Sequence, residues 1–70
     1  MGESEKKILV PLWQKELLSV KEAAAYFGIG ENKIREITAG ANNPYVLWIG
    51  NKRMIKRRLM EGYIEEAIEI

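Results

Sequence analysis

The side chains with the most distinctive chemistry in this 70-residue chain are basic, and they are concentrated in one stretch of the sequence. Residues 31–58 contain seven lysines and arginines against two glutamates, whereas residues 59–70 contain four glutamates and no basic residue. A lysine or arginine beside a phosphate releases condensed counterions and so gains affinity for nucleic acid. The distribution of charge, and not the net charge of +1, therefore predicts contact with a nucleic-acid backbone.

Other kinds of chemistry have few candidate residues. The chain has no cysteine, which excludes disulfides and thiolate metal sites, and no histidine, the commonest metal ligand and general base. Its serines have no histidine to activate them. Its apolar runs are too short for a signal peptide or a membrane span. We expect a cytoplasmic protein that is not an enzyme and needs no cofactor or metal.

Residues 19–40 must position part of the basic stretch, and their pattern predicts a helix-turn-helix. Ser19 and Glu22 form a capping box at the start of the first helix. Gly28 allows the positive φ that reverses the chain, and Gly30 caps the second helix, which we expect to continue to Gly40.

The apolar spacing assigns a face to each of these helices. In the first helix, Ala24 is small enough for the second helix to cross close to it. In the second helix, Ile34 and Ile37 face inward. The polar face then carries Glu31, Asn32, Lys33, Arg35, Glu36 and Thr38.

A β-hairpin is predicted to follow the second helix. Residues 45–49 and 52–56 have strand composition and are joined by Gly50-Asn51. A basic hairpin tip beside a helix-turn-helix is a wing, which can reach along a phosphate backbone. We assign Trp48 to packing, and Trp13 to a lid over the core.

The two ends of the chain complete the predicted organisation. Residues 1–7 are expected to be a disordered lead, and residues 8–70 a single domain beginning with an apolar extended segment at 8–13. Residues 58–70 show helical spacing with two possible apolar stripes, so the phase of this helix stays open. Gly62 within it suggests close packing against another element. The fold class is α+β: a winged helix-turn-helix with three helices and a two-stranded β-hairpin wing.

The chain resembles the excisionases of conjugative transposons over nearly its whole length. The resemblance is carried by the run LSVKEAAAYFGIGENKIREI, a strand with Trp48, the hairpin tip Gly50-Asn51-Lys52-Arg53, and the Pro11-Leu12-Trp13 segment. It implies a winged-helix protein that binds double-stranded DNA near the ends of a mobile element, bends it, and biases a tyrosine recombinase towards excision. We expect a monomer in solution that binds DNA cooperatively. The alternatives are a small winged-helix transcriptional regulator and a protein-interaction module.

The predicted site residues follow from the basic stretch and from this resemblance. DNA-binding residues are expected on the second helix (Asn32, Lys33, Arg35), on the wing (Asn51, Lys52, Arg53) and after it (Lys56, Arg57, Arg58). The last three either contact phosphates, which positions the protein on the DNA, or balance the negative charge of the nearby glutamates. The acidic residues Glu61, Glu65, Glu66 and Glu69 are either a solvated face or a docking surface for a basic partner such as the recombinase.

Overall fold

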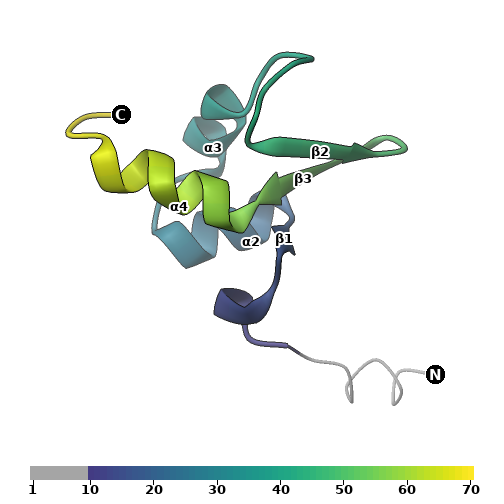
Figure 1. Ribbon diagram of the computed structural model, residues 1–70, viewed down its shortest axis with the longest axis horizontal. Coiled ribbons are helices and arrows are strands. Elements are labelled where there is room, and N and C mark those ends of the chain that lie inside the picture. Colours follow the sequence, from purple (N-terminus) through teal and green to yellow (C-terminus); the bar gives the residue numbers. More distant parts are fainter. Residues whose placement is uncertain (1–9) are drawn as a thin grey trace.

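Four helical segments and three short strands make up the structure, a computed structural model that describes residues 10–70 (Figure 1). The predicted disordered lead and the start of the extended segment lie outside the described residues. In chain order the elements are the 3₁₀ helix η1 (Leu12–Gln14), β1 (Leu17–Leu18), α2 (Val20–Phe27), α3 (Glu31–Ile37), β2 (Val46–Ile49), β3 (Lys52–Lys56) and α4 (Arg57–Glu66). Within residues 10–70 no helix has the length and apolar character needed to cross a membrane.

The capping box predicted for α2 is present. The Glu22 backbone N–H donates to Ser19 Oγ at 3.1 Å, and the Ser19 backbone N–H donates to Glu22 Oε1 at 2.9 Å. Lys15 Nζ also donates to Glu22 Oε2 at 2.5 Å, and this hydrogen bond is the main reason that the pKa of Glu22 lies below its usual value. Gly28 ends the helix at φ 71°, the left-handed conformation expected there. The start and end of α2 are therefore both set by local sequence.

The end of α3 differs from the prediction, because the helix stops at Ile37 and not at Gly40. Asn43 Nδ2 donates to the carbonyls of Ile37 at 2.8 Å and Ala39 at 3.0 Å. The side chain thus satisfies backbone acceptors that another helical turn would otherwise use. Gly40, at φ 99°, lies in the loop that follows.

The hairpin belongs to a three-stranded antiparallel sheet of order β1-β3-β2, where two strands were predicted. In β2 and β3, Val46 pairs with Ile55 and Trp48 pairs with Arg53. Leu18 of β1 pairs with Ile55 on the other side of β3. A two-residue strand has no sequence signature of its own, and only its partner 37 positions along the chain makes Leu18 part of a sheet.

The core lies between one face of the sheet and the helices. Its fully buried residues come from every layer of the fold: Leu18, Ala23, Ile34, Ile55 and Met60, with Val46 almost buried and Leu12 and Phe27 packed against them. Ala23 is the small residue of α2 that is completely buried. Ala24, which was predicted to lie where the second helix crosses, is only half-buried. Trp13 is 59% exposed, so the prediction of a tryptophan lid was wrong, and Leu12 takes that place against the core.

The structure settles the phase of the last helix and shortens it. Met60 is buried, and Tyr63 and Ile64 pack against the core, while Leu59 and Ile68 are exposed. The helix ends at Glu66: Ala67 is already extended, and Ile68 after it is fully exposed. Gly62 is exposed, and a Cβ added there meets no atom within 4 Å, so the predicted close packing at Gly62 was wrong.

Candidate nucleic-acid interface

Helix α3 presents its polar residues to solvent beside the sheet. Asn32 and Arg35 are exposed and Lys33 is half-buried. Lys33 pairs with Glu36 at 3.2 Å, and Arg35 pairs with Glu31 at 3.6 Å. Exposed pairs of this kind contribute about 0–1 kcal/mol each. Their basic side chains can therefore exchange a carboxylate for a phosphate or a base at little cost.

Arg53 connects the wing to α3. Its Nη1 atom donates to the Arg35 carbonyl and to Thr38 Oγ1, both at 3.3 Å. Its guanidinium carbon lies 5.4 Å from the centre of the Trp48 ring on the neighbouring strand, within the range of a cation–π interaction. One side chain of β3 is thus held by α3 on one side and by β2 on the other. Arg53 of the wing and the C-terminal part of α3 consequently lie on adjoining parts of one surface.

The tip of the wing is exposed and basic. Asn51 and Lys52 are exposed at the turn between β2 and β3. Gly50 has a φ of 61°, while no non-glycine residue between 10 and 70 has a positive φ. Positive φ at the first turn position alone is typical of a type II′ turn, whose twist suits a tight hairpin. The turn between β2 and β3 lies at the far end of the molecule from α4 (Figure 1).

The three basic residues after the wing have different surroundings. Arg57 is nearly buried: its Nε donates to the Lys15 carbonyl at 2.5 Å and its Nη1 to Glu61 Oε2 at 2.9 Å. The first of these bonds ties the start of α4 to the segment before β1, and the second lies within α4. Lys56 is half-buried and pairs with β1, whereas Arg58 is exposed. The structure therefore gives Arg57 an internal bonding role and leaves Arg58 the most accessible of the three.

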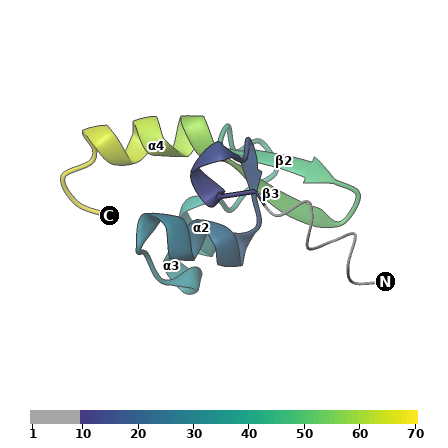
Figure 2. The ribbon, with the colours of Figure 1, turned by 90° about the horizontal axis from the view of Figure 1, so that it is seen from below.

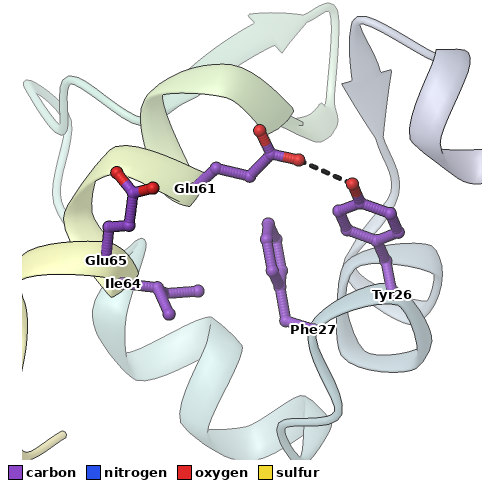
Figure 3. A pocket seen from close by; sticks show the side chains of 5 residues that line it. All are labelled: Tyr26, Phe27, Glu61, Ile64 and Glu65. Atoms are coloured by element: carbon purple, nitrogen blue, oxygen red, sulfur yellow. Dashed lines mark hydrogen bonds between the residues drawn. The ribbon is translucent and has the colours of Figure 1, made fainter.

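The four glutamates predicted as a docking surface are not equivalent either. Glu61 accepts hydrogen bonds from Tyr26 Oη at 2.6 Å and from Arg57, as the dashed line in Figure 3 shows for the tyrosine. The Tyr26 hydroxyl is the main cause that lowers the pKa of Glu61, and the same bond raises the pKa of Tyr26. Glu65 and Glu66 are exposed on α4, and Glu69 lies beyond its end.

Sequence reasoning missed two residues at the interface. Thr38, predicted to face outward, is fully buried, and its hydroxyl donates to the Ile34 carbonyl at 2.7 Å while accepting from Arg53. Its position four residues after Ile34 was the available signal, since residues at that spacing share a helix face. Trp48, assigned to packing, is 45% exposed beneath Arg53. No local pattern predicted this arrangement, because the strand pairing brings the two side chains together.

Comparison with known proteins gives two matches over most of the chain. Residues 1–70 match a family described as "Excisionase from transposon Tn916". The "Excisionase from transposon Tn916" of Streptococcus agalactiae serotype V (strain ATCC BAA-611 / 2603 V/R) is 37% identical over 57 residues, which cover 80% of this chain and 85% of that protein. No solved structure matches the chain.

Proposed function

Because this chain belongs to the family of excisionases from transposon Tn916, we propose that it binds duplex DNA near the ends of a mobile element through α3 and the wing. As a member of that family it is an accessory factor in transposon excision and not an enzyme. In the proposed mechanism the bound protein bends the DNA and so favours excision by a tyrosine recombinase. Several copies bind cooperatively, each contributing a small surface.

The contact between Arg53 and α3 is the observation that carries the proposal. It supports a single surface in which Asn32, Lys33 and Arg35 approach one groove while the wing lies alongside. Arginine or lysine recognises guanine O6 and N7, and asparagine recognises adenine N6 and N7. Base contacts then come from α3, and Asn51 and Lys52 at the tip contact the phosphate backbone.

We expect bending because two contacts lie on one body. A wing held against α3 presents its contacts at a set spacing, and a duplex that does not match this spacing when straight deforms to meet both elements. The deformation costs energy that the additional contacts repay. Neither Arg57 nor Glu61 takes part in this step, since their hydrogen bonds are to each other and to neighbouring elements.

The salt dependence of DNA binding tests the proposal. A gel shift with the ends of the mobile element is run at increasing salt for the wild type and for Lys33→Gln and Lys52→Gln. Loss of one phosphate contact reduces the salt slope by about 1. Lys15→Gln is the matched control, because Lys15 is also ion-paired but precedes β1, on the opposite edge of the sheet from β2.

The outcome of this titration is decisive. We expect Lys52→Gln to lower both the affinity and the salt slope, and Lys33→Gln to lower the affinity for the element ends, with the Lys15→Gln control unchanged. The proposal is rejected if the wild type shows no shift at low salt, or if the Lys15 variant loses as much affinity as the other two. Measuring the bend with circularly permuted DNA fragments, and excision frequency in cells, then separates an excision factor from a regulator of transcription.

A further inference from the structure

A groove separates the end of α2 from the middle of α4 (Figure 3). Its volume is about 410 Å³, and it is lined by Tyr26, Phe27, Glu61, Ile64 and Glu65. The Phe27 ring and the Ile64 side chain form an apolar floor, and the two carboxylates lie along the α4 edge. This size lies within the range of sites that accept a small molecule or an anchoring side chain.

The two carboxylates differ in how they are held. Glu61 is fixed by hydrogen bonds from Tyr26 and Arg57, so one of its oxygens is already satisfied and its charge is partly neutralised. Glu65 lies four residues further along the same helix and is exposed. The groove therefore combines apolar surface with an accessible negative charge at its rim.

This combination determines which kind of partner fits. Phosphates are repelled by Glu65 and Glu61, so DNA is excluded from the groove. Arginine and lysine have an apolar stem and a cationic end, and they pack the stem on apolar surface while the charge stays near solvent. In both ribbon views the α2 and α4 segments that form the groove lie at the opposite end of the molecule from the wing tip (Figures 1 and 2). A side chain bound in the groove therefore leaves the wing tip free to contact DNA.

We propose that the groove binds an arginine or lysine side chain, flanked by apolar residues, on a segment of a protein partner. The stem packs on Phe27 and Ile64, and the cationic group pairs with Glu65. The identity of the partner rests on the proposed function: it is the recombinase that acts on the same DNA. The contact then holds the recombinase at one end of the excision factor while the wing holds the duplex at the other.

A peptide titration tests the chemistry of the groove independently of DNA. The full chain labelled with ¹⁵N is titrated with the acetylated, amidated tripeptide Leu-Arg-Leu, and with Leu-Gln-Leu as the neutral control. We expect saturating shifts of the Phe27, Ile64 and Glu65 amides with the arginine peptide only. Glu65→Gln is expected to weaken binding about three- to fivefold, as loss of an exposed ion pair implies. Glu66→Gln, the same change on the next residue of the helix, leaves the affinity unchanged.

Excision in cells tests the partner. Glu65→Lys is expected to lower the excision frequency at least about tenfold, with element-end DNA binding unchanged in a gel shift, while Glu66→Lys excises normally. Equal loss in both variants, normal excision by Glu65→Lys, or equal shifts with the two peptides would overturn the proposal. If the wild type fails to bind DNA, the proposed function is wrong. The peptide titration still tests whether the groove binds an arginine side chain.

Discussion

Removing the Arg53 side chain tests whether the wing is fixed to α3. Arg53→Ala removes two hydrogen bonds of 3.3 Å, to the Arg35 carbonyl and to Thr38 Oγ1, together with the contact over Trp48. Both hydrogen bonds are longer than the usual range of 2.7–3.2 Å, so each contributes near the lower limit of about 0.5 kcal/mol. An exposed cation–π contact adds about 0.5–1 kcal/mol. The expected loss of unfolding free energy is therefore about 1.5–2 kcal/mol.

Thermal unfolding measures this loss. In a domain of this size, 1 kcal/mol lowers Tm by about 4–8 °C, so Arg53→Ala is expected to lower Tm by at least about 6 °C. Lys52→Ala is the matched control, since Lys52 is the preceding residue of the same strand and is exposed at the turn. Surface substitutions of that kind change stability by less than about 0.5 kcal/mol.

A double-mutant cycle assigns the effect to the contact with α3. Thr38→Val keeps the shape of the buried side chain and removes the hydroxyl that accepts from Arg53. The Ile34 carbonyl keeps its backbone partner, because the Thr38 N–H still donates to it at 3.0 Å. We expect a coupling energy of about 0.5 kcal/mol between the two positions. Strict additivity, or a Tm for Arg53→Ala equal to that of Lys52→Ala, would refute a wing held by α3.

Three further measurements test the local structure. By thermal unfolding, Gly28→Ala is expected to lower the free energy of unfolding by about 1–2 kcal/mol, because φ at Gly28 is 71°. Gly62→Ala is expected to raise it by about 1 kcal/mol, because Gly62 is an exposed helical residue and a Cβ added there meets no other atom. Ser19→Ala removes the hydroxyl of the capping box and is expected to cost about 1 kcal/mol by denaturant unfolding, while a value near zero would show that the cap adds nothing. The bond between Tyr26 and Glu61 lowers the pKa of the acid and raises that of the phenol. Its stabilisation is therefore complete between about pH 4.3 and 10, is lost as pH falls through the folded-state pKa of Glu61, and is lost as pH rises through that of Tyr26. The denaturant midpoint of the wild type is expected to fall at both the acid and the alkaline end of the pH range, and that of Glu61→Gln to change less. Identical pH profiles for the two proteins would contradict the proposed stabilisation.

Local sequence determined the helix-turn-helix and the hairpin turn. Ser19 and Glu22 satisfy backbone groups within one turn of helix, and Gly28 supplies a left-handed conformation that other residues adopt only with strain. Gly50-Asn51 between two strand-forming runs fixes the hairpin in the same way. These signals act over a few residues, so no knowledge of the rest of the fold was needed.

Only the tertiary structure decided which basic and acidic residues are available to a partner. Charge alone gave Arg53, Arg57 and Arg58 the same predicted role, yet Arg53 joins the wing to α3, Arg57 bonds the segment before β1, and Arg58 is exposed. The same holds for Glu61, which accepts from Tyr26 on another helix, and for Glu65, which stays exposed beside the groove. The partners of these side chains lie as many as 42 positions away in the sequence, and only the folded chain brings them together.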